Sequence, residues 1–242
     1  MEWILLFLPA FLSVYALSRR FLFRSWSPDS RGEASSCAMS LSHGTPAVLL
    51  ATRSLLLSPG TRSFCSPNSS PDDLVLEFSI AYFLSDLVHL IVFAPSDVLF
   101  IAHHLATLFV FLTCRYLAHH GAYELLVLLV MAEVTSVPQN AWTLARIRRS
   151  ESTSANKVYA RLCLPFYTFY SIVRGILAPI FVFKMGAFYM GGGCGGVISR
   201  WVWMPWLVVI GGAIGVSILW VYNNWVEYVR GSGRKKRSEK EN

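Results

Sequence analysis

The feature that most constrains this fold is a series of apolar runs, each about 20 residues long. A helix of that length spans the ~30 Å hydrocarbon core of a bilayer and satisfies its backbone N–H and C=O groups internally. The chain has 242 residues, of which 54% are hydrophobic and 14% charged. Soluble domains carry roughly 25% charged residues. The sequence therefore predicts an all-α fold, a polytopic bundle of transmembrane helices.

These runs predict about seven membrane spans. The second is the weakest, because Ser40, His43 and Arg53 interrupt it, and such a segment inserts only if its polar face meets other helices. Without this span the count falls to six. The expected spans are residues 3–17, 34–57, 74–93, 98–117, 122–144, 158–183 and 201–226. The chain divides accordingly into an N-terminal membrane anchor with a polar linker (1–33), a transmembrane domain (34–226) and a basic cytosolic tail (227–242).

The formal net charge of +7 does not indicate a nucleic-acid partner. The basic residues cluster in short loops between apolar runs, which is the positive-inside pattern of membrane proteins. With seven spans and the N-terminus outside the cytosol, fourteen Lys and Arg residues fall on the cytosolic side and four on the other. We therefore expect a lumenal N-terminus and a cytosolic C-terminus.

Three ionisable residues on separate spans fall at one depth. Asp86 precedes the turn at Pro95 by about as many residues as His104 follows it, and Glu133 lies equally far from the end of its span. At a rise of 1.5 Å per residue, each sits roughly 13–15 Å below the cytosolic surface. A charge at that depth is costly unless it is paired or wetted. The spacing predicts an inward-facing polar cluster, either a functional site or a buried network that fixes helix packing.

Further polar residues repeat at helical spacing and so share faces with one another. Arg174 lies deep enough to need a carboxylate, a ligand head group or water, and Glu133 is one candidate partner. The groups are Asp86 with His89, His103 with Thr107, Glu133 with Ser136 and Asn140, and Tyr167 with Tyr170 and Arg174.

Neither the histidines nor the cysteines follow a metal-binding pattern. No two of the six histidines are spaced i, i+3 or i, i+4, as the His-rich boxes of membrane di-iron enzymes require. The five cysteines form no Cys-x-x-Cys pair. We expect no metal and no other cofactor. Cys65 and Cys194 both fall in extracytosolic loops and are able to pair, a point that the sequence leaves open.

Four motifs together carry a family resemblance. They are Ser42-His43-Gly44, Tyr82-Phe83-x-x-Asp86, His103-His104-x-x-Thr107 and Glu133-x-Thr135-Ser136-x-Pro138-x-Asn140. Over about residues 35–226 the chain resembles the TLC-domain family, multi-pass membrane proteins that include the ceramide synthases. Those enzymes carry a His-Asp pair followed by another Asp where this chain has Val130-Met131-Ala132-Glu133. The sequence therefore looks closer to the non-ceramide-synthase branch.

The resemblance implies a location in the endoplasmic reticulum and a role for the paired histidines. In ceramide synthases these histidines are implicated in acyl transfer from acyl-CoA to a sphingoid amine. The implied catalytic residues here are His103, His104 and Asp86. The remaining candidates form a lipid-binding or structural polar cluster of His43, His89, Thr107, Glu133, Ser136, Asn140, Tyr170 and Arg174.

Three functions stay open at this point. The first is binding of a membrane lipid or acyl chain in a cavity between the third and sixth spans, with a role in membrane lipid homeostasis. The second is acyl-CoA-dependent N- or O-acylation of a lipid, with His103 and His104 catalytic. The third is a non-catalytic scaffold or lipid transporter, in which the polar cluster only holds the helices together.

Overall fold

The computed structural model describes residues 2–57 and 62–241, which are mostly helical. Strands are absent from these ranges, and an isolated bridge joins Pro67 to His120. The all-α prediction is confirmed. Three π-helical segments, η1 (Ser18–Leu22), η2 (Cys114–Ala118) and η3 (Val173–Leu177), extend or join the α-helices. The α-helices are α1 (Glu2–Leu17), α2 (Pro28–Leu57), α3 (Ser70–Phe93), α4 (Val98–Thr113), α5 (Ala122–Glu133), α6 (Ser136–Arg148), α7 (Thr153–Ile172), α8 (Ala178–Met190) and α9 (Arg200–Glu241).

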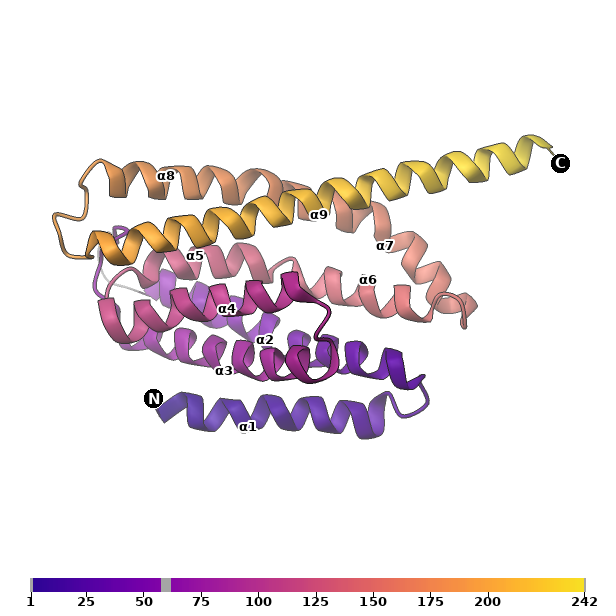
Figure 1. The fold of residues 1–242 in the computed structure, drawn as a ribbon, viewed down its shortest axis with the longest axis horizontal. Coiled ribbons are helices and arrows are strands. Elements are labelled where there is room, and N and C mark those ends of the chain that lie inside the picture. Colours follow the sequence, from indigo (N-terminus) through magenta and orange to yellow (C-terminus); the bar gives the residue numbers. More distant parts are fainter. Residues whose placement is uncertain (1, 58–61, 242) are drawn as a thin grey trace.

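Most of these helices run along one direction and form an elongated bundle (Figure 1). Within the described residues, six helical stretches are long and apolar enough to cross a membrane. α2 makes a further pass along the bundle, so the two chain ends lie at opposite ends of it (Figure 1). The six stretches are Trp3–Leu22, Ser70–Phe93, Val98–Ala118, Ala122–Arg148, Thr153–Met190 and Arg200–Arg230.

The weakly apolar helix α2 lies inside the bundle, packed against α3, α5 and α6. Its 30 residues give it a length of ~45 Å. Met39, His43 and Ala47 along its length have no exposed surface. His43, one of the polar residues that weaken this span, therefore meets protein and not lipid, whereas Arg53 near the end of the helix is exposed.

Three helices, α2, α3 and α7, begin several residues earlier than expected because local caps start them. Pro28 takes the first position of α2, and the backbone N–H of Ser30 donates to Ser27 Oγ at 3.4 Å. The start expected at residue 34 is therefore corrected to Pro28. At α3, Ser69 and Asp72 form a reciprocal capping box, so the helix begins at Ser70 and not at residue 74. At α7, Ser152 Oγ accepts from the Ala155 N–H, so the helix begins at Thr153 and not at residue 158.

The prolines of the later spans act in different ways. α5 ends at Glu133 and α6 begins at Ser136, two residues before Pro138, because proline supplies no N–H to bond the Val134 carbonyl in the turn before it. Pro165 lies within an uninterrupted α7. The π-helical turn η3 separates α7 from α8 and ends just before Pro179.

The end of the bundle that holds the N-terminus is fastened by covalent and polar contacts. A disulfide joins Cys65, before α3, to Cys194, after α8, with Cα atoms 5.6 Å apart. The pairing that the sequence left open is therefore formed. The buried carboxylate of Asp72 accepts hydrogen bonds from Arg62 and Ser54. These contacts hold the loops of this end against the helices.

Candidate functional site

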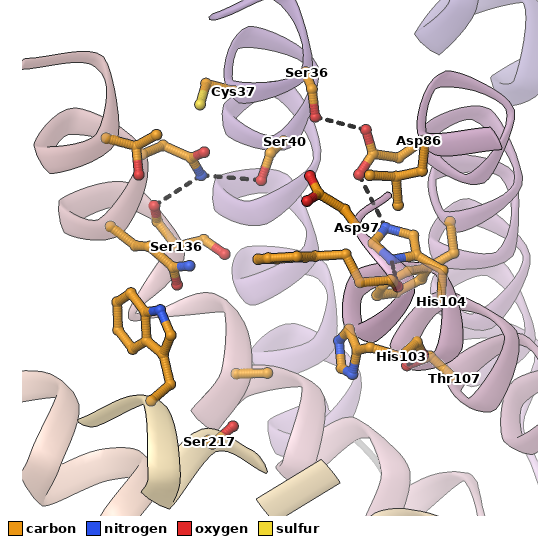
Figure 2. A pocket seen from close by; sticks show the side chains of 18 of the residues that line it. Ser36, Cys37, Ser40, Asp86, Asp97, His103, His104, Thr107, Ser136 and Ser217 are labelled. Carbon is orange, nitrogen blue, oxygen red and sulfur yellow. Dashed lines mark hydrogen bonds and ion pairs between the residues drawn. The ribbon is translucent and has the colours of Figure 1, made fainter. Parts of the chain in front are cut away.

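Asp86 of α3 and His104 of α4 form a hydrogen-bonded pair inside the bundle. His104 Nε2 lies 2.9 Å from Asp86 Oδ2, and its Nδ1 lies 2.8 Å from the carbonyl oxygen of Phe100. Ser36 of α2 donates to the other carboxylate oxygen of Asp86 at 2.7 Å. Figure 2 shows Asp86 between the serine hydroxyl and the imidazole. Two of the three residues expected at one depth are thus in direct contact.

Glu133, the third of these residues, belongs to a neighbouring group. Ser136 Oγ donates to Glu133 Oε2 at 2.7 Å, and His43 Nδ1 lies 3.8 Å from the same oxygen. His43 Nε2 lies 3.1 Å from Ser79 Oγ. A methyl group on Gly44 would sit 2.8 Å from Glu133 Oε2. Glycine therefore allows α2 to approach the break between α5 and α6.

A polar stripe on α2 joins the two groups. Ser36, Ser40 and His43 are spaced i, i+4, i+7 and so lie on one face of the helix. Asn140 Nδ2 donates to Ser40 Oγ at 2.9 Å and to the Ser136 carbonyl at 2.9 Å. Ser36 and Ser40 are site residues that the sequence analysis missed, and the helical spacing of this stripe is the signal that indicates them.

A cavity of about 1290 Å³ lies beside this network. Polar side chains from α2, α3, α4 and α5 line part of it (Figure 2). Another part of the wall is apolar and comes from one face of α9. The apolar part consists of Val209, Ile210, Ala213 and Ile214, and polar residues of α9 (Ser217, Asn224 and Glu227) line the cavity further along the helix.

The cavity reaches charged residues at one end of the bundle. Its lining includes Glu33 near the start of α2, Asp97 at the turn before α4 and Arg149 after α6. These positions lie at the end opposite the Cys65–Cys194 disulfide. The cavity is therefore open at the end away from the fastened loops.

The imidazole of His103 faces the cavity, and neither of its ring nitrogens is hydrogen-bonded to another described residue. Its ring centroid lies 5.8 Å from that of His104 and 6.3 Å from that of Phe83. Thr107, on the same face of α4, donates to the His103 carbonyl at 2.9 Å and also lines the cavity. The ring nitrogens of His103 are thus available to a ligand.

Arg174 reaches the cavity from η3, and it forms no direct ion pair with Glu133, although the two side chains lie within electrostatic reach of each other. Arg174 Nη2 donates to the Ala132 carbonyl at 2.8 Å, and its Nε donates to Thr135 Oγ1 at 3.2 Å. Ala132 lies in the last turn of α5 and Thr135 in the break between α5 and α6, and the Ala132 carbonyl also accepts from Thr135 Oγ1 at 2.7 Å. The guanidinium therefore binds neutral oxygens in place of the carboxylate.

Two residues of the predicted cluster lie apart from it. His89 borders the cavity, but its Nδ1 lies 2.9 Å from the hydroxyl of Tyr15 on α1. Tyr170 is buried among aromatic side chains of α7 and α9, with its ring centroid 4.9 Å from that of Trp220. Tyr170 meets the site through Arg174, whose guanidinium lies 5.3 Å from its ring centroid.

The chemistry offered by this arrangement is proton exchange and ion recognition. Within the described residues, 2–57 and 62–241, no group of three or more His, Cys, Asp or Glu side chains is placed to hold a metal ion. A ligand in the cavity meets an imidazole, a carboxylate–imidazole pair and a guanidinium. These groups can bind an acid or accept a proton from an amine or hydroxyl.

Residues 33–226 match the model of a family described as the TLC domain. A TLC domain-containing protein of Arabidopsis thaliana is 57% identical over 224 residues, which cover 92% of this chain and 88% of that protein. No solved structure matches the chain. The similarity thus extends over nearly the whole helical bundle.

Proposed function

Because the chain belongs to the TLC-domain family, we propose that this multi-pass membrane protein binds a lipid in its cavity and acts in membrane lipid homeostasis. One observation carries the proposal: a cavity of about 1290 Å³ combines a polar wall with an apolar wall on α9. Pockets for small molecules usually measure roughly 300–1,000 Å³. This cavity therefore has room for a head group together with part of a long acyl chain.

The division of the lining suits an amphipathic ligand. Apolar residues such as Val209 and Ile214 offer van der Waals contact to a hydrocarbon chain, worth about 0.8 kcal/mol for each buried CH₂ group. The polar head group would lie near His103 and the Asp86–His104 pair, where donors and acceptors replace its contacts with water.

Lipid retention by cavity-filling variants tests this function. Ala213→Phe places a large side chain on the cavity wall, whereas Val216→Phe adds one on an exposed part of the same helix. After purification in a neutral detergent, mass spectrometry measures the lipid bound per protein. We expect severalfold less lipid with Ala213→Phe and no change with Val216→Phe. A wild-type protein that retains no lipid would contradict the proposal.

A second candidate function is acyl-CoA-dependent acylation of a lipid amine or hydroxyl, favoured by the unpartnered His103 ring beside the Asp86–His104 pair. In that reaction His103 accepts the proton of the amine or hydroxyl as its N or O atom attacks the thioester carbonyl. The C–S bond breaks, the acyl group forms an amide or ester, and CoA leaves as a thiolate that takes up the proton. Consumption of acyl-CoA that is lost in His103→Ala would support it; lipid retention without turnover would favour binding alone.

We place the protein in the endoplasmic reticulum, with the N-terminus lumenal and the cavity opening to the cytosol. The charge asymmetry of the loops supports this orientation. So does the disulfide between Cys65 and Cys194, because disulfides persist in oxidising compartments such as that lumen. Acyl-CoA, which is cytosolic, would then reach the open end of the cavity.

A further inference from the structure

Arg174 brings a positive charge to the cavity and forms no direct ion pair with a carboxylate among the described residues, although Glu133 lies within its electrostatic reach. The atoms that accept its hydrogen bonds, Ala132 O and Thr135 Oγ1, are neutral. The Tyr170 ring, 5.3 Å from the guanidinium, stabilises the cation but does not cancel its charge. A cation at membrane depth is costly unless an anion or water meets it.

The acids of the neighbouring network are engaged elsewhere. Glu133 Oε2 accepts from Ser136 and lies near His43. Both carboxylate oxygens of Asp86 are occupied, one by His104 and the other by Ser36. The charge of Arg174 is therefore not met by direct contact with either acid.

Arg174 lines the cavity and keeps unused hydrogen-bond donors. The hydrogen bonds to Ala132 and Thr135 use Nη2 and Nε, so both N–H groups of Nη1 have no partner within the described chain. His103, which lines the same cavity and has a free ring, lies within electrostatic reach of Arg174. Both side chains therefore line a cavity whose α9 wall is apolar from Val209 to Ile214.

We propose that the cavity selects a lipid with an anionic head group, a phosphate or a carboxylate, and that Arg174 binds this group with His103 as a second donor. The proposal rests on the lipid-binding function above and specifies the class of its ligand. A planar guanidinium with free N–H groups matches the oxygens of either anion. The acyl chain would extend along Ala213 and Ile214 of α9.

Pairs of lipids that differ in their charge test this preference. Fluorescently labelled phosphatidic acid and diacylglycerol with identical chains form one pair, and labelled palmitic acid and hexadecanol form the other. Binding is measured by titration of the purified full-length protein in a neutral detergent. We expect the wild type to bind the charged member of at least one pair about tenfold more tightly. Inorganic phosphate at matched concentration should displace little of the bound lipid.

Three variants separate the role of Arg174 from a general effect of charge. Arg174→Gln should remove the preference for the charged lipid and leave the affinity for the neutral lipid nearly unchanged. Arg161→Gln makes the same change on an exposed position of α7 outside the cavity, and it should keep the preference. Arg174→Lys retains the charge without the planar fork, so an intermediate preference is expected.

The outcomes distinguish this proposal from the function on which it rests. Equal affinity of the wild type for both members of both pairs would overturn the anionic selectivity and leave lipid binding intact. Failure of every lipid to bind would overturn the proposed function as well. If inorganic phosphate displaced the labelled lipid as effectively as unlabelled phosphatidic acid at the same concentration, the site would be one for free anions and the proposal of a lipid ligand would be wrong. If Arg174→Gln does not fold, the test rests on the preference of the wild type for charged lipid and on that of Arg174→Lys. A preference as strong as that of the wild type in either folded variant would show that Arg174 does not bind the head group.

Discussion

His104 is hydrogen-bonded at both ring nitrogens, with Nδ1 2.8 Å from the Phe100 carbonyl oxygen and Nε2 2.9 Å from Asp86 Oδ2. A carbonyl oxygen only accepts, so Nδ1 carries a hydrogen, and the hydrogen bond to Asp86 needs a second proton, on either Nε2 or Oδ2. The ring of His104 cannot turn without losing two hydrogen bonds. His103, the next residue, has a ring free of such contacts and a place on the same cavity.

Replacement of Asp86 by asparagine should lower lipid turnover or binding more than the same change at Asp97. The amide can still accept from Ser36 and donate to His104, so the fold is retained, but it can neither carry the negative charge of a carboxylate nor take up a proton. Asp97 is exposed at a turn and caps no helix by its side chain. Activity at equal expression and the unfolding temperature of both variants measure the difference. Equal losses of activity would argue against a site at Asp86.

The two histidines should respond differently to alanine substitution. His104→Ala leaves the buried Asp86 carboxylate without its imidazole partner and should destabilise the protein by about 1–3 kcal/mol. His103→Ala removes no side-chain hydrogen bond, so its unfolding temperature should stay near that of the wild type while turnover or ligand affinity falls. Thermal unfolding in detergent, combined with a lipid assay, checks both. A destabilised His103→Ala with normal ligand binding would show that the ring is structural.

Gly44→Ala should destabilise the bundle. The added methyl group would meet Glu133 Oε2 at 2.8 Å and Ser136 Cβ at 3.1 Å, so α2 must move away from the α5–α6 break. Overpacking of this kind costs about 1–3 kcal/mol, more than the ~1 kcal/mol that alanine gains over glycine in a helix. Gly212→Ala on α9 is the matched control, because its methyl group meets nothing within 4 Å. Denaturation curves showing equal stability for both variants would disprove the close approach.

Loss of the disulfide should weaken the loops at the fastened end and leave the cavity intact. Cys65→Ser with Cys194→Ser removes a link across 129 residues of sequence, and such links typically contribute about 2–4 kcal/mol. We expect the double variant to unfold at a lower temperature than the wild type and to retain the same amount of lipid. Wild-type protein whose disulfide has been reduced with a thiol reagent should show the same lower unfolding temperature. Unaltered stability in both samples would mean that the hydrogen bonds of Asp72 suffice to hold this end.

The orientation can be checked with inserted glycosylation sites in microsomes. The native sequon at Asn68 is a poor reporter for two reasons. Pro71 follows the sequon directly, and the Asn68 side chain donates to the Cys114 carbonyl and accepts from the Ala122 N–H. A lengthened loop with a sequon near residue 68 should be glycosylated, whereas one near Ser152 should not. The reverse pattern would turn the open end of the cavity toward the lumen.

The sequence predicted the contact between Asp86 and His104 well, because both lie equally far from the same turn and a buried charge needs a partner. It did not indicate the direct partners of Arg174, because the two neutral oxygens that accept from the guanidinium, Ala132 O and Thr135 Oγ1, are brought to it only by the folded chain. His89 was placed on the face of Asp86, yet the position of α1 decides that its ring meets Tyr15.

Ser36 and Ser40 show a different limit of sequence reasoning. Serine is common in helices, and unlike a charged residue it can face either lipid or protein at little cost. Its role therefore depends on which helix packs against it. Once α2 is known to pack against α3 and α6, the two hydroxyls fall opposite Asp86 and Asn140. The cap of α3 at Ser69, in contrast, was readable from local sequence and was overlooked.

The interior position of α2 has a consequence for the order in which this protein is assembled during synthesis. α2 is too polar to partition into lipid alone, and the helices α5 and α6 that cover it leave the ribosome only after α3 and α4. It must therefore be sheltered, by the insertion machinery or by its neighbour α3, until α6 is complete. Ser40 and Asn140, separated by 100 positions in the chain, meet only at that late stage, so a truncated protein ending before α6 should leave α2 open to degradation.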